Sequence, residues 1–104
     1  MNATTKAYEE KISAQLQQTR AQLEELEARA KGKLAQAEIE TISHLKAKHQ
    51  EIEKKRQDLK TSADAKAEQV KAEIDAEMAK FKTSLEQLTT KLKSEVRTKA
   101  SEHG

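Results

Sequence analysis

Apolar residues recur along the chain at intervals of three and four residues, which is the period of an α-helix. Between Val70 and Val96 the apolar positions advance in seven steps over 26 residues, a mean near 3.7. This mean is closer to an eleven-residue repeat than to a seven-residue repeat. The pattern therefore predicts helices that pack nearly straight, or with a slight right-handed supercoil.

A turn is predicted near the middle of the chain. Thr61 and Asp64 have the spacing of a capping box, and Ser62 is an alternative cap. Facing residues in a hairpin have position numbers with a constant sum, and pairs such as Ile52 with Val70 give 122 or 123. We therefore predict an all-α, long antiparallel helical hairpin, with a helix over about residues 6–60, a turn at 61–64 and a helix over about residues 63–100.

Gly32 is the other place where the first helix could end. Lys33, Leu34 and Ala35 follow it, and none of them is a Ser, Thr, Asp or Asn that would cap a new helix. We therefore interpret Gly32 as a glycine inside the helix, at a cost of about 1 kcal/mol relative to Ala. The alternative is a bend at Gly32 that folds the chain into a three-helix bundle.

The residues expected to pair the helices form one stripe along each predicted helix. They are Tyr8, Ile12, Leu16, Leu23, Leu26, Ile39, Ile42, Leu45, His49, Ile52 and Leu59 before the turn, and Val70, Ile74, Met78, Phe81, Leu85, Leu88, Leu92 and Val96 after it.

A hairpin leaves some of these apolar residues without cover. Tyr8, Ile12 and Leu16 overhang the shorter second helix, and the apolar face widens over residues 34–45. Two helices alone also bury only a thin layer. We therefore expect a homodimer with four-helix packing, with the compact three-helix monomer as the alternative and another helical protein as a further partner.

Composition agrees with a helical rod. Ala, Glu, Lys, Leu and Arg supply 60 of the 104 residues, and 20 basic residues nearly balance 18 acidic ones. The length fits one domain over residues 1–104. Because the charges are mixed along the chain and aromatic residues are few, a nucleic-acid partner is disfavoured. An amphipathic pattern flanked by lysines leaves a membrane surface as an alternative partner.

Candidate chemistry is sparse. The chain has no Cys, and His44 and His49 are five residues apart, whereas two metal ligands on one helix are usually three or four apart. No phosphate-binding loop, nucleophile elbow or zinc-protease motif occurs. We expect no catalytic residues, no metal, no cofactor and no small-molecule substrate. The first eleven residues lack the apolar segment of a signal peptide, so we expect a cytoplasmic protein.

Several segments resemble a family of small bacterial coiled-coil proteins, of about 100 residues, that is named for the stress response. The resemblance covers roughly residues 7–75. It rests on Tyr8-Glu9-Glu10-Lys11, Ala14-Gln15-Leu16, Leu26-Glu27-Ala28-Arg29-Ala30-Lys31, Ile42, Leu45, Lys48, Leu59, Ser62, Asp64 and Ala65. It implies a helical hairpin or bundle associated with stress, without catalytic residues. We therefore expect a non-catalytic helical interaction or scaffold protein that self-associates.

Overall fold

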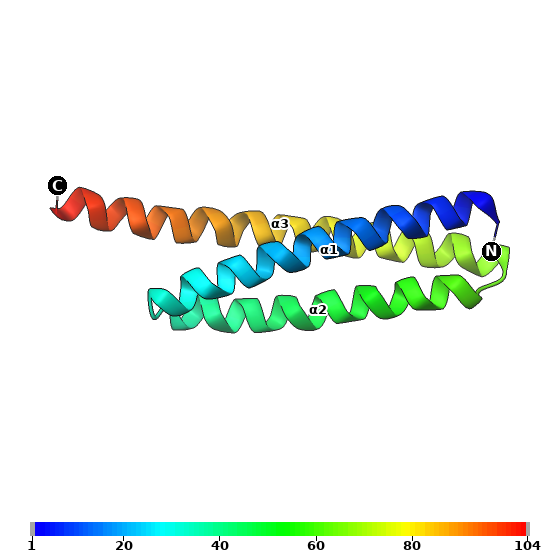
Figure 1. The fold of residues 1–104 in the computed structure, drawn as a ribbon, viewed down its shortest axis with the longest axis horizontal. Coiled ribbons are helices and arrows are strands. Elements are labelled where there is room, and N and C mark those ends of the chain that lie inside the picture. Colours follow the sequence, from blue (N-terminus) through cyan, green and yellow to red (C-terminus); the bar gives the residue numbers. More distant parts are fainter. Residues whose placement is uncertain (1, 104) are drawn as a thin grey trace.

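The computed structural model describes the backbone of residues 2–103 and the side chains of residues 2–93. Three helices follow one another: α1 (Ala3–Gly32), α2 (Gln36–Thr61) and α3 (Asp64–His103). They run up, down and up as an elongated bundle with extents of 59 × 19 × 17 Å (Figure 1). The predicted all-α class is confirmed, in the form of the three-helix alternative.

The prediction of one continuous helix over residues 6–60 is wrong. α1 ends at Gly32 and α2 begins at Gln36, so the chain reverses direction at residues 33–35. Reversal lets three helices enclose one core, whereas a hairpin of two long helices leaves each apolar stripe half covered. The bend near Gly32, which the sequence offered as an alternative, is therefore the observed arrangement.

A Schellman motif ends α1. The Ala35 N–H donates to the Ala30 carbonyl at 2.9 Å, and the Leu34 N–H donates to the Lys31 carbonyl at 3.1 Å. This motif requires a left-handed backbone conformation at the residue directly after the helix C-cap, a position that glycine usually occupies. Here Leu34 takes it, with φ of 56°, while no glycine in the described chain has a positive φ. Gly32 therefore lies within the last helical turn and is not the residue that reverses the chain.

The second connection lies where the sequence predicts a turn. α2 ends at Thr61 and α3 begins at Asp64. The predicted capping box is wrong, because the Thr61 and Ser62 hydroxyls donate back to the Asp58 carbonyl at 3.2 and 2.7 Å. These hydroxyls thus close the end of α2 and leave the start of α3 to the backbone, where the Ala67 N–H donates to the Ala63 carbonyl at 2.8 Å.

One apolar core runs along the bundle. Its buried members include these predicted pairing residues: Ile12, Leu16, Leu23, Leu26, Ile42, Leu45, Ile52, Leu59, Val70, Ile74, Met78, Phe81, Leu85, Leu88 and Leu92. Ala30 and Ala67 complete it, and Tyr8 and Ile39 pack against it half-buried. Val96 lies outside the residues whose side chains the structure describes. The stripe read from the sequence is therefore the core of a single chain.

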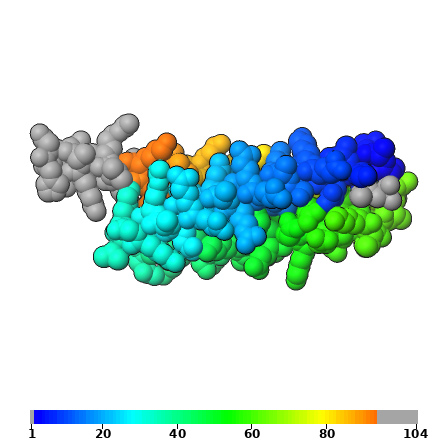
Figure 2. Space-filling model, in the orientation of Figure 1, coloured from blue at the N-terminus to red at the C-terminus, as the bar shows by residue number. Residues whose placement is uncertain are grey.

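The overhang that suggested a dimer is absent. Ile12 and Leu16 each expose 2% of their surface, and the Tyr8 hydroxyl bonds to α3. Reversal at residues 33–35 brings α1 back over α2 and α3, where α1 covers one side of the bundle (Figure 2). Among the described residues, no helix is long and apolar enough to cross a membrane.

Candidate functional site

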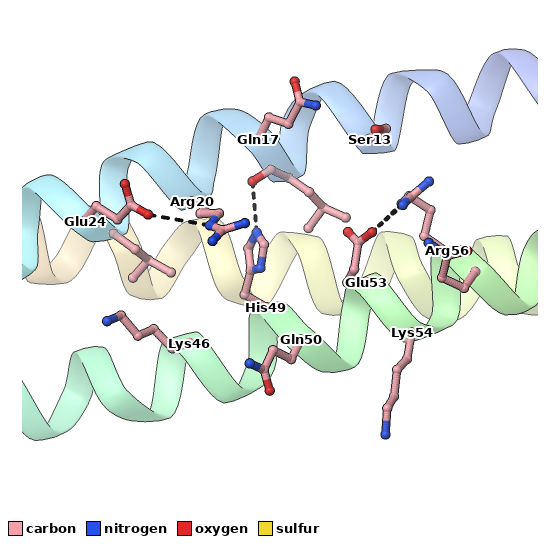
Figure 3. A pocket seen from close by; sticks show the side chains of 13 residues that line it. Ser13, Gln17, Arg20, Glu24, Lys46, His49, Gln50, Glu53, Lys54 and Arg56 are labelled. Atoms are coloured by element: carbon pink, nitrogen blue, oxygen red, sulfur yellow. Dashed lines mark hydrogen bonds and ion pairs between the residues drawn. The ribbon is translucent and has the colours of Figure 1, made fainter.

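A groove of about 730 Å³ runs between α1 and α2. Charged and amide side chains form most of its lining, with Leu16 and Leu23 also contributing. Figure 3 shows how these side chains lie: His49 points from α2 toward α1, whereas Lys54 extends away from it. We call this the α1–α2 groove. Its residues are Ser13, Leu16, Gln17, Arg20, Leu23, Glu24, Lys46, His49, Gln50, Glu53, Lys54, Arg56 and Gln57.

His49 joins the two helices at the centre of this groove. Its Nε2 lies 2.9 Å from the Leu16 carbonyl oxygen (Figure 3). Because a carbonyl only accepts, this contact requires the hydrogen on Nε2. The ring also lies 6.0 Å from the Phe81 ring, tilted by 52°. His49 therefore touches all three helices, which agrees with its prediction as a pairing residue and gives it a polar bond besides.

The charges beside this groove are largely matched. Arg20 pairs with Glu24 at 3.5 Å, and Lys46 reaches Glu27 on α1 at 2.5 Å. The hydrogen bond from Lys46 is the main cause that holds the pKa of Glu27 below its usual range. Because these pairs are exposed, each contributes little to stability. They leave a polar groove with a mixed charge, which is not suited to concentrating one kind of ion.

A more buried ion pair lies at the end of the groove near residues 62–63. Arg56 on α2 pairs with Glu9 on α1 and with Glu53 one turn earlier on α2. The Arg56 and Glu9 side chains are only 11% and 10% exposed. Hydrogen bonding from Arg56 is the largest cause lowering the pKa of Glu53. This pair fixes α1 to α2 where no connection joins them.

A second groove, of about 770 Å³, lies on the other side of α1, between α1 and α3. Gln15, Gln18 and Gln22 line it at helical spacing along α1. Thr89 and Thr90 add hydroxyls from α3. We call this the α1–α3 groove. Its residues are Gln15, Gln18, Thr19, Gln22, Glu25, Leu26, Arg29, Lys82, Leu85, Glu86, Thr89, Thr90 and Lys93.

Neither groove resembles a metal site. Among the described residues, no group of three or more His, Asp or Glu side chains is placed to hold an ion. His44 is exposed and His49 is half-buried, and neither belongs to such a group in the described part of the chain. The grooves offer amides, hydroxyls and matched charges, which are groups that recognise another polar surface by hydrogen bonds.

Several of these contacts were missed by sequence reasoning. Glu9 and Arg56 are 47 residues apart, and Tyr8 bonds to Asp75 at a separation of 67 residues. Both contacts require that α1 folds back, so the prediction of a continuous first helix hides them. The three glutamines at helical spacing are visible in the sequence, but they read as an ordinary solvated face.

Comparisons with models of protein families, with curated proteins and with solved structures give no match. Function is therefore inferred from the chemistry of the chain itself, and the resemblance to the stress-response family stays a prediction.

Proposed function

We propose that this chain is a non-catalytic helical interaction protein that self-associates through the α1–α3 groove. The observation that supports the proposal is the lining of that groove. Its glutamine side chains each carry both donors and acceptors, so the lining suits a second copy of the same surface. The Thr19 and Thr89 hydroxyls already donate within their own helices. In a twofold dimer the same patch faces itself, and this self-complementarity is what such an interface requires.

Charge supports the same arrangement. The groove carries Arg29, Lys82 and Lys93 against Glu25 and Glu86. An antiparallel copy would place opposite charges within reach without accumulating one sign. The α1 and α3 helices of a second copy, laid against α1 and α3 of the first, would form a four-helix layer, the packing expected from the sequence. The interface we propose is polar, and it leaves the core of each chain closed.

Light scattering over a range of protein concentrations tests the proposal. The wild type is expected to show a mass that rises toward twice that of the chain. The double variant Gln18→Glu with Gln22→Glu places like charges across the twofold interface, and it is expected to weaken association about tenfold or more. The matched control is Gln50→Glu with Gln57→Glu, which adds the same charge to the α1–α2 groove.

Two outcomes would contradict the proposal. One is a wild type with the mass of a single chain at every concentration. The other is equal weakening by both double variants, because that would indicate a general effect of charge. Circular dichroism of each variant shows whether the helices remain formed. The proposed cytoplasmic location and the link to stress rest on the sequence, and cell fractionation and protein abundance under stress test them.

A further inference from the structure

Leu34 is the large apolar side chain that lies exposed in the described part of the chain, with 86% of its surface accessible. It sits at the 33–35 connection, at one end of the paired α1 and α2 (Figure 1). Its φ of 56° is a conformation that leucine adopts only at an energetic cost. Glycine or asparagine would suit this position better, and both would remove the exposed apolar surface. Local energetics and hydration therefore both disfavour leucine here.

Basic residues surround this leucine. Residues 28–37 contain Arg29, Lys31 and Lys33 and no acidic residue. The Lys33 ammonium donates to the Leu92 carbonyl at 2.6 Å, which brings the α3 segment of Lys91 and Lys93 to the same end of the bundle. Lys91 pairs with the largely buried Glu38 at 2.9 Å and is therefore left out of the set. We call Arg29, Lys31, Lys33, Leu34 and Lys93 the basic tip.

The positive charge of the basic tip remains available to a partner. Arg29 and Lys31 pair with Glu25 and Glu27 at 3.2 and 4.0 Å within α1, but the two basic side chains are 49% and 63% exposed. Exposed pairs of this kind are weak and exchange readily for another anion. Lys33 bonds to a carbonyl, and such a bond leaves its charge in place.

We propose that the basic tip docks on an anionic phospholipid surface, with Leu34 inserted among the acyl chains and the basic side chains against the headgroup phosphates. An exposed apolar residue with basic residues near it matches such a surface, because the apolar side chain suits the acyl chains and the basic side chains suit the anionic headgroups. A protein partner would instead need an apolar pocket for Leu34. The two grooves of the described residues are lined mainly by polar and charged side chains, so a second copy offers no such pocket there.

Docking through the basic tip leaves the apolar core closed within the bundle, because Leu34 is exposed and does not belong to that core.

Vesicle co-sedimentation tests the docking surface. The full chain is expected to sediment with phosphatidylcholine vesicles that contain phosphatidylserine, not with pure phosphatidylcholine, and to be released by high salt. Leu34→Asn keeps a residue that tolerates the left-handed conformation, and it is expected to weaken binding about tenfold. Lys31→Glu is expected to weaken binding at least several-fold. The matched control is Lys66→Glu, an exposed lysine at the other end of α2 and α3, and it should bind as the wild type does.

Three results would overturn the docking surface. They are no sedimentation of the wild type with anionic vesicles, Leu34→Asn binding as tightly as the wild type, and Lys66→Glu weakening binding as much as Lys31→Glu. Light scattering without lipid tests whether a second copy of the chain binds the basic tip instead. If the wild type has a mass above that of one chain and Leu34→Asn abolishes this association, the basic tip binds a second copy. The basic tip shares Arg29 and Lys93 with the α1–α3 groove. The Gln18 and Gln22 variants leave both of these residues unchanged, so vesicle binding that persists when self-association is weakened separates the two proposals.

Discussion

The Tyr8 hydroxyl of α1 lies 2.5 Å from Asp75 Oδ1 of α3, and it donates its hydrogen to that carboxylate. The Lys71 carbonyl is a second acceptor at 3.0 Å, and the Lys71 ammonium lies 5.7 Å from the centre of the Tyr8 ring. These contacts hold the first turns of α1 on α3. Burial, followed by the hydrogen bond to Asp75 and the repulsion by its charge, raises the pKa of Tyr8 well above its usual 10.0.

The raised pKa predicts a loss of stability at high pH. The folded chain favours the protonated phenol, so this contribution is fully present below about pH 10 and decreases as the pH rises through the higher folded value. Tyr8 is the single tyrosine, so tyrosinate absorbance reports on it directly. We expect titration in the folded chain at higher pH than in the chain unfolded by denaturant. Asp75→Asn should reduce the difference, and equal titration curves would contradict this account.

Replacement of the same hydroxyl predicts a measurable cost at neutral pH. Tyr8→Phe keeps the ring on the core but removes the donor to Asp75 and the Lys71 carbonyl. We expect a loss of about 1 to 2 kcal/mol in urea unfolding, because one bond goes to a charged acceptor and the other, to the Lys71 carbonyl, is partly buried. Thr41→Val, which removes an exposed hydroxyl bonded only within its own helix, is the control and should change little.

The apolar stripe predicts the core well because burial is a property that each helix carries in its own sequence. The reversal at residues 33–35 is different. Ala35 makes no side-chain cap, and the left-handed residue is Leu34 and not Gly32. Local signals therefore favour a continuous helix, and the break is stabilised by packing: Ala30 is fully buried and Ala35 rests on the core. Contacts between α1 and its neighbours could not be predicted without this break.

The predicted pairing residues show the same difference between burial and partner. The apolar stripe predicts that Phe81 pairs the helices, and Phe81 exposes only 3% of its surface. The constant-sum register pairs it with Ile42, whereas its ring contact is with His49, seven residues further along α2. Side chains lean toward the N-terminus of their own helix, which for Phe81 is toward the turn and for His49 is away from it. A side chain of α3 therefore meets a side chain of α2 whose backbone lies nearer the turn. Spacing alone therefore places residues on a face but not opposite a particular partner.

Leu34→Gly is expected to stabilise the bundle by about 1 kcal/mol, because glycine adopts a positive φ without the steric cost that leucine has. The control is Leu34→Ala, which removes the same exposed apolar surface but keeps a Cβ in the left-handed conformation. Thermal unfolding followed by circular dichroism measures both. A gain from Ala equal to that from Gly would show that exposure and not backbone conformation sets the effect.

Gly32→Ala is expected to stabilise the bundle by about 0.5 to 1 kcal/mol. Gly32 belongs to the last turn of α1 without a positive φ, and a Cβ added there meets no atom within 4 Å. Alanine also restricts the unfolded chain more than glycine does. Urea unfolding of the two proteins gives the difference, and a clear loss of stability would indicate that Gly32 is the left-handed residue after all.

Phe81→Asp is expected to destabilise the bundle by at least about 2 to 3 kcal/mol, since it places a carboxylate in the core and removes the ring contact with His49. Lys80→Asp changes the neighbouring, exposed position, which lies outside both grooves, and is expected to have little effect. Equal midpoints of thermal unfolding for the two variants would contradict the packing of α3.

Arg56→Ala is expected to cost about 2 to 3 kcal/mol at neutral pH, because it leaves the largely buried Glu9 carboxylate without its main partner. The cost depends on pH in a definite direction. The pKa of Glu53 is lowered in the folded chain, so the stability that its pairing with Arg56 contributes is present above pH about 4.3 and is lost as the pH falls through the folded value. The difference in the free energy of unfolding between Arg56→Ala and the wild type should therefore become smaller in acid.

Arg20→Ala, which breaks only an exposed pair, is the control, and its free energy of unfolding should match that of the wild type within about 0.5 kcal/mol at every pH. If the difference in the free energy of unfolding between Arg56→Ala and the wild type stays constant from neutral pH to pH about 3, lost packing and not lost charge pairing causes the effect.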